Sequence, residues 1–220
     1  MMQLIVFMDK IKKHPFILYY LLSSIYVLLS IVLGLILGNG LVIFLGWNMV
    51  LATFVLVLSE IVHHTIEKKK SKGLIISSIF MWVLFFPNAF YILTDFIHFQ
   101  NYTYFLSYPD LYAFKFADWL VFFHVVIGAL IALKLGILSI NHLIKHIKKN
   151  TIIYLSVLFL ASSFGIYLGR FIRLNSWDIF KFQLIIQTVF DRFWFMIGFV
   201  SLFFIIHWMS YILFKDKKSI

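Results

Sequence analysis

The sequence predicts an all-α, polytopic integral membrane protein, a bundle of six transmembrane helices. Composition, long apolar segments and charge distribution are the three observations that predict it. Of 220 residues, 63% are hydrophobic and only 13% are charged. A soluble domain is roughly 45–50% apolar and about 25% charged, so the composition favours lipid as the solvent. The chain has no cysteine, which excludes disulfides and thiolate metal sites.

Six segments are apolar enough to cross a membrane, for which a helix needs about 20 apolar residues. Pro87 interrupts the third of them, because proline removes an amide donor and clashes with the preceding turn. A short interfacial helix is expected between the fifth and sixth segments. We place the spans in one transmembrane domain, residues 1–220, at about residues 16–37, 41–62, 74–99, 118–140, 151–170 and 193–214.

The charged residues divide unevenly between the two sides of the predicted membrane. The side that holds both termini has 14 lysines and four acidic residues, so 14 − 4 = +10. The other side has five cations and five acidic residues, so 5 − 5 = 0. This asymmetry follows the positive-inside rule and predicts cytoplasmic N- and C-termini. The lysine runs are explained as topology anchors, and we assign them no role with nucleic acid.

The first of two polar islands lies in the third segment and contains Asn88, Tyr91, Asp95 and His98. On an α-helix that advances about 100° per residue, the four side chains share one face. In membrane proteins such a polar stripe normally faces the bundle interior or a water-filled cavity. Asn88 suits contact with a ligand and equally suits a hydrogen bond to a carbonyl freed by Pro87.

Asp95 and His98 are three residues apart and can therefore meet on one helix face. A carboxylate beside an imidazole can perform acid–base catalysis, which makes this pair the catalytic candidates. The pair can instead bind a divalent metal together with Asp118, or form a hydrogen bond that only positions the helix.

The second polar island follows the fifth segment and begins with Arg170 and Arg173. Two arginines three residues apart can grip one phosphate or carboxylate with several donors. They can also contact lipid phosphates generally, or pair with Asp95 or Asp178. Asn175 and Asp178 are further ligand candidates, although Asp178 equally suits the first turn of the interfacial helix.

Helix rise adds two residues to the candidate site. Asn48 on the second segment and His124 on the fourth lie about 10 Å below the same membrane edge. Together with Asn88 they would form the floor of one outward-facing pocket, with the charged residues of the two islands at its rim.

The two islands also carry a family resemblance. The runs FPNAFYILTDFIHF and FGIYLGRFIRLNSWDIF, with Gly46-Trp47-Asn48, resemble the signatures of a bacterial membrane-protein family labelled domain of unknown function 1361. Phe90 departs from the pattern, in which a second proline is expected. The resemblance implies a multi-pass bacterial inner-membrane protein and carries no established activity.

These residues favour an extracytoplasmic pocket that binds or processes an anionic envelope ligand. A lipid-linked head group is one such ligand. Membrane lipids are the expected partners, and a divalent metal is the one cofactor considered. A small-solute transporter or channel is an alternative, because a proline break and intramembrane polar residues are typical of such sites. A non-enzymatic envelope assembly or sensor subunit is another. The sequence has no recognisable nucleophile motif, and it leaves open whether the protein is an enzyme.

Overall fold

The computed structural model describes residues 16–106, 111–147, 149–173, 183, 186 and 191–215. Six helical segments are long and apolar enough to cross a membrane, which confirms the predicted all-α architecture. They are α2 (Ile17–Ile36), α3 (Gly40–Glu67), α4 with α5 and η1 (Lys72–Phe85, Asn88–Tyr91 and Ile92–Asn101), α6 (Phe116–Ile144), α7 with η2 (Thr151–Tyr167 and Leu168–Ile172), and α9 (Phe193–Phe214).

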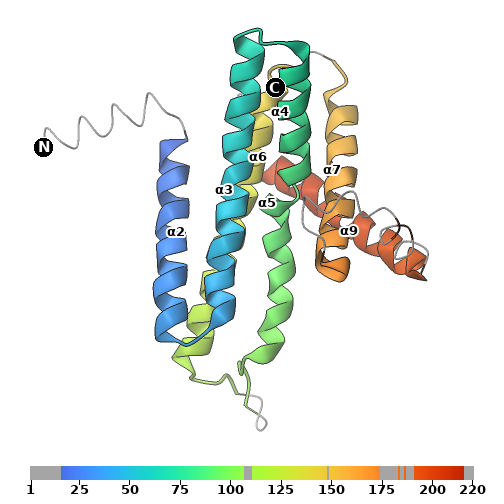
Figure 1. The fold of residues 1–220 in the computed structure, drawn as a ribbon. Helices are drawn as coiled ribbons and strands as arrows, with labels where there is room; N and C mark the ends of the chain where they lie inside the picture. Colours follow the sequence, from blue (N-terminus) through green and yellow to red (C-terminus); the bar gives the residue numbers. More distant parts are fainter. Residues whose placement is uncertain are drawn as a thin grey trace, which may run out of the picture.

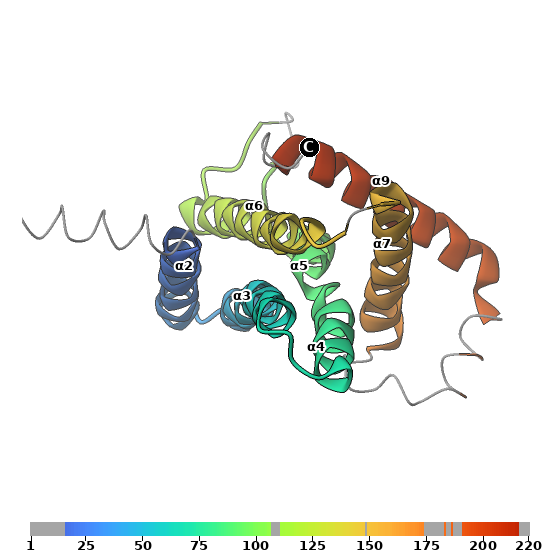
Figure 2. The ribbon, with the colours of Figure 1, turned by 90° about the horizontal axis from the view of Figure 1, so that it is seen from above.

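The helices are arranged around α3 and α6, which are the most buried of the six segments (Figures 1 and 2). α2 packs along α3 on one side, and α4 packs along α3 on another. α9 crosses α7 obliquely at the edge of the bundle, where Figure 2 shows it running past the other helices. Large apolar side chains such as Leu35, Ile36 and Trp194 are exposed on the outer helices, as expected for surfaces that contact lipid.

A tight turn between α2 and α3 holds these two helices antiparallel. Gly38 adopts a positive φ of 58°, and the Asn39 side chain accepts a hydrogen bond from the Leu41 amide at 3.1 Å. Gly34 allows close approach here, because a Cβ at this position would lie 2.4 Å from the Ile43 side chain. The turn leads α3 into the centre of the bundle.

The third segment is broken at Pro87, as predicted. α4 ends at Phe85, and the Asn88 side-chain nitrogen donates to the Phe85 carbonyl at 2.8 Å. Beyond α5 the chain continues as a 3-10 helix, η1, instead of the expected α-helix. Thr94 follows the same three-residue spacing, since its hydroxyl donates to the Tyr91 carbonyl at 2.7 Å. The change matters because side chains three apart are eclipsed in a 3-10 helix.

The fifth segment ends irregularly. α7 passes into a five-residue π-helical turn, η2, and Arg173 follows it in the left-handed conformation with φ 59°. Arg170 and Arg173, which the sequence predicted to act together on one anion, therefore lie within the π-helical turn and just beyond it, not on a continuous α-helix. The predicted interfacial helix lies largely outside the described residues, and so do Asn175 and Asp178.

His207 joins α7 and α9 inside the core. It is fully buried, and its Nε2 lies 2.8 Å from the Ser162 hydroxyl. Its Nδ1 lies 2.7 Å from the Phe203 carbonyl, and its ring stacks on Phe90 at 3.9 Å between centroids. Phe90, the position at which a proline was expected, thus contributes to the packing between the third segment and α9.

Candidate functional site

A buried carboxylate joins three of the membrane segments. Asp95 on η1 is 0% exposed. Its Oδ2 accepts a hydrogen bond from the Asn48 side chain on α3 at 2.7 Å, and its Oδ1 accepts from Arg170 Nη1 at 3.3 Å. Both carboxylate oxygens therefore have partners, as a buried charge requires. The two polar islands, 75 residues apart in sequence, meet at this ion pair.

Arg170 makes further contacts around the same carboxylate. Its Nη2 donates to the Thr94 carbonyl at 2.6 Å and lies 3.4 Å from His98 Nε2. The guanidinium carbon lies 5.8 Å from the centre of the Tyr91 ring, within range of a cation–π contact. We call Asn48, Tyr91, Asp95, His98 and Arg170 the Asp95–Arg170 cluster.

The irregular helices position this cluster. Three residues per turn in η1 place His98 directly one turn beyond Asp95, with Nε2 4.0 Å from Oδ1. On the opposite segment, Gly165 packs against Pro87, where a Cβ would lie 3.0 Å from the proline Cγ. This close approach brings η2, and with it Arg170, beside η1.

The contacts define the charge state of the cluster. An arginine side chain has only donors, so His98 Nε2 is the acceptor and the ring proton lies on Nδ1. The Asp95 and Arg170 charges cancel. His98 is 32% exposed and Arg170 16%, whereas Asp95 is enclosed. The cluster thus presents His98 and Arg170 outward and keeps its carboxylate inside.

The other predicted site residues divide into those near the cluster and those engaged elsewhere. Arg173 is exposed and, among the described residues, lies outside the hydrogen-bonded group around Asp95. Asn88 donates to the Phe85 carbonyl, so it fulfils the backbone role considered for it. His124 bonds Ser30 at 2.8 Å and stacks on Tyr26 at 4.3 Å.

Asn48 joins Asp95, whereas His124 bonds Ser30, so the described hydrogen bonds do not join the three residues of the proposed pocket floor. Equal depth on neighbouring helices did not imply a shared face.

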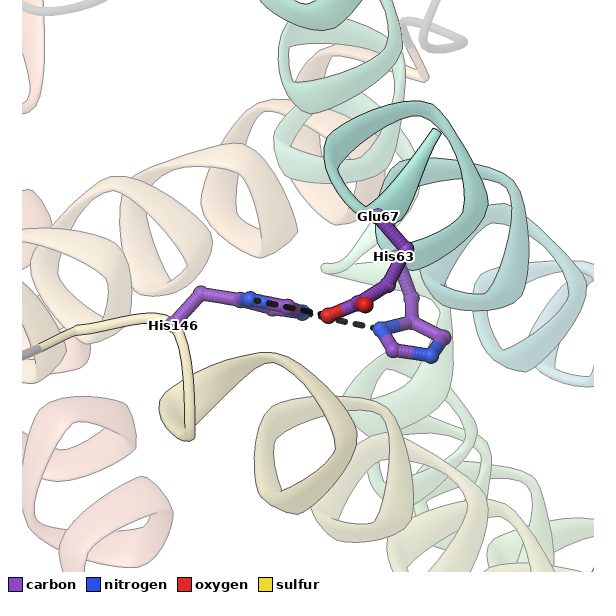
Figure 3. A group of neighbouring side chains, drawn as sticks. All are labelled: His63, Glu67 and His146. Carbon is purple, nitrogen blue, oxygen red and sulfur yellow. Dashed lines mark hydrogen bonds and ion pairs between the residues drawn. The ribbon is translucent and has the colours of Figure 1, made fainter. Parts of the chain in front are cut away.

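The predicted metal set of Asp95, His98 and Asp118 is not brought together. The Asp118 carboxylate instead accepts from the Thr103 amide at 2.9 Å. Within the part of the chain that the structure describes, the set with suitable metal geometry is His63, Glu67 and His146 (Figure 3).

That set was missed from the sequence. Its signal was a pair of i, i+4 spacings, His63 with Glu67 and His142 with His146, near the ends of the second and fourth segments.

Comparison with known proteins identifies a family and no described relative. No curated protein and no solved structure matches the chain. The profile described as "Protein of unknown function (DUF1361)" matches residues 47–210, which include both polar islands and Asn48. The chain is therefore a multi-pass membrane protein that belongs to the DUF1361 family.

Proposed function

We propose that the protein binds an anionic head group of an envelope ligand, such as a lipid-linked phosphate, at the extracytoplasmic end of the bundle in a bacterial inner membrane. The observation that carries the proposal is the fixed orientation of Arg170. Asp95 and the Thr94 carbonyl hold its guanidinium, and His98 lies beside it. A preorganised guanidinium loses little side-chain entropy on binding a planar or tetrahedral oxyanion.

The charge balance supports an anion over a cation. Asp95 neutralises Arg170, so the positive charge next to this ion pair in the sequence is that of the exposed Arg173, three residues beyond Arg170. Three of the five N–H donors of Arg170 are used by Asp95, Thr94 and His98. Donors that remain on Arg170, together with Arg173, suit an oxyanion that approaches from the exposed side.

The sidedness of the proposal depends on charge. The lysine excess falls at the end of the bundle opposite to Asp95, at the linker between α3 and α4 and after α6. The positive-inside rule then makes the Asp95–Arg170 end extracytoplasmic.

Lipid binding in mixed detergent–lipid micelles tests the proposal. Native mass spectrometry would count phosphatidylglycerol and phosphatidylcholine molecules bound to the purified protein. We expect Arg173→Ala to weaken phosphatidylglycerol binding about tenfold, which corresponds to about 1.4 kcal/mol, without changing phosphatidylcholine binding. Lys115→Ala is the matched control, because it removes an exposed positive charge at the same end outside the cluster. Equal phosphatidylglycerol affinity in wild type and Arg173→Ala, or an equal loss in Lys115→Ala, would contradict the proposal.

Transport of a small anion is a second candidate, favoured by one observation. Both segments that meet at the ion pair are interrupted, the third by Pro87 and η1 and the fifth by η2. Interrupted helices that face each other often form the substrate sites of transporters. Anion flux into proteoliposomes that wild type supports and Arg170→Lys does not would favour transport over simple binding, since lysine keeps the charge but loses the planar fork.

A further inference from the structure

We infer that the end of α3 remote from Asp95 carries a binding site for a first-row divalent transition-metal ion, such as Zn²⁺, with His63, Glu67 and His146 as its ligands. Fifteen residues separate His63 from Asn48 on α3, which is about 22 Å along the helix. The site is therefore distinct from the Asp95–Arg170 cluster, and its evidence is independent of the proposed function.

The positions of the ligands follow from helix spacing and helix direction. His63 and Glu67 are four residues apart in the last turns of α3 and so share one face. His142 lies in the last turn of α6, and His146 lies in the turn just beyond its end at Ile144. α3 and α6 run in the same direction through the bundle, so their C-terminal ends lie at one side (Figure 1).

The distances are close to those that a metal requires. His63 Nδ1 lies 2.8 Å from His146 Nε2, and one ligand atom from each of the three residues lies within 4.8 Å of the others (Figure 3). Two imidazole nitrogens on a tetrahedral Zn²⁺, each at 2.0–2.1 Å, are about 3.3 Å apart. The histidine pair would need to separate by only about 0.5 Å (3.3 − 2.8) to hold the ion.

The donor set selects the class of ion. Two imidazoles and one carboxylate suit Zn²⁺ and its first-row neighbours, whereas Mg²⁺ and Ca²⁺ prefer oxygen ligands. The Glu67 side chain is 59% exposed, so a bound ion would keep a position open to water. Three protein ligands with one open position characterise zinc sites that can activate water or exchange their metal.

A second observation at the same end points to a missing ligand. Within the described structure, His142 Nδ1 and both polar atoms of the Asn141 side chain are buried without a hydrogen-bond partner. The His142 ring lies 4.5 Å from that of His63. Buried polar atoms without partners are uncommon because each costs about 1–3 kcal/mol. The His142 nitrogen, in a ring that lies beside His63, indicates a place where an ion with its water would supply a partner.

The surrounding charge limits the affinity without favouring another class of ligand. Glu67 is the single carboxylate of the group; Lys68 follows Glu67 in the sequence, and Lys145 precedes His146. Binding must therefore depend on coordination by imidazole nitrogen more than on Coulomb attraction. This predicts that Zn²⁺ and Co²⁺ bind and that Mg²⁺ does not compete with them.

The metal content of the purified protein tests the inference directly. The full chain would be purified in detergent with an affinity tag that lacks histidine, incubated with Zn²⁺, separated from free ion by gel filtration, and analysed by elemental mass spectrometry. We expect about one Zn²⁺ per chain, and at least a tenfold weaker affinity in His63→Ala/His146→Ala. His64→Ala is the matched control, since His64 adjoins His63 on α3 but is exposed and outside the group.

Two results would overturn the inference: wild type that carries no more Zn²⁺ than the double variant, or His64→Ala that loses as much. Glu67→Gln gives a variant with little risk to folding, because Glu67 is exposed, and it should weaken binding while the protein elutes as wild type. If the double variant does not fold, the visible absorption spectrum of wild type with bound Co²⁺ tests the site instead. Visible absorption bands that Zn²⁺ abolishes support the site, and their absence overturns it.

Discussion

At one end of α3, Asn48 donates to a fully buried carboxylate that also pairs with an arginine from another segment. At the other end, His63 and His146 share one hydrogen bond beside an exposed Glu67, and among the described residues the nearby His142 Nδ1 has no hydrogen-bond partner. The first cluster joins three helices through satisfied polar groups. The second is a group of three residues whose side chains could serve together as metal ligands.

The difference separates two uses of polar residues in a membrane protein. A buried carboxylate with a partner on each oxygen stabilises the arrangement of the helices around it, and removing a partner leaves a buried charge without compensation, which is costly. A partly buried group of histidines can lose one member at smaller cost, because water can reach the site and replace the lost hydrogen bond. Stability measurements should therefore respond strongly at the Asp95 end and weakly at the His63 end.

The largest effect is expected from Arg170→Met. Asp95 would be left enclosed and unpaired, which should lower the free energy of unfolding by about 3–5 kcal/mol. Denaturant titration in detergent, followed by circular dichroism, would measure the loss. Asp95→Asn/Arg170→Met removes both charges and should recover a large part of it. If Arg170→Met alone is as stable as wild type, the ion pair does not stabilise the bundle.

A smaller loss is expected from Asn48→Ala. The substitution removes the hydrogen bond to Asp95 Oδ2 and leaves Arg170 in place. The unsatisfied oxygen should cost about 1–3 kcal/mol in the same assay. Asn101→Ala is the control, since Asn101 is exposed at the end of η1 and should change stability by less than about 0.5 kcal/mol. Equal losses of stability in the two alanine variants would show that Asn48 does not stabilise the cluster.

The smallest effect on the metal-free protein is expected from His146→Ala. Loss of the partly buried hydrogen bond to His63 should cost no more than about 1 kcal/mol. Added Zn²⁺ should then increase the difference in stability between the two proteins, because an ion at 100 times its Kd stabilises wild type by about 2.7 kcal/mol and the variant much less. Thermal unfolding without Zn²⁺ measures the cost of the substitution, and unfolding with Zn²⁺ measures the stabilisation by the ion. An equal rise in the Tm of wild type and His146→Ala on addition of Zn²⁺ would contradict a site at His146.

The sequence predicted the helices better than it predicted their contacts. Apolar length and Pro87 were sufficient for the six segments and for the break, because lipid imposes span length and proline imposes its own geometry. Asp95, His98 and Arg170 were identified as candidates because charge inside an apolar chain is costly without a use. Nothing local to either island indicated that they face each other.

The errors had specific physical causes. Helical phase was calculated at about 100° per residue, whereas η1 is a 3-10 helix and η2 a π-helix. Arg173 therefore follows an irregular turn and lies outside the hydrogen-bonded group that contains Arg170. The His63–His146 pair was missed although its spacing was visible. Recognising it required combining the i, i+4 spacings with the expectation that the second and fourth segments end on the same side.

The 3-10 winding of η1 has a mechanical consequence. Ten residues at about 2.0 Å each reach about 5 Å farther than the same residues at 1.5 Å in an α-helix. That length carries the chain to Tyr102, whose hydroxyl accepts from the Asn39 side chain at 2.8 Å in the α2–α3 turn. Rewinding η1 as α-helix would withdraw Tyr102 from this turn and rotate His98 by about 60° relative to Asp95. The length of η1 and the angle between His98 and Asp95 are therefore coupled, because both are set by the same 3-10 geometry.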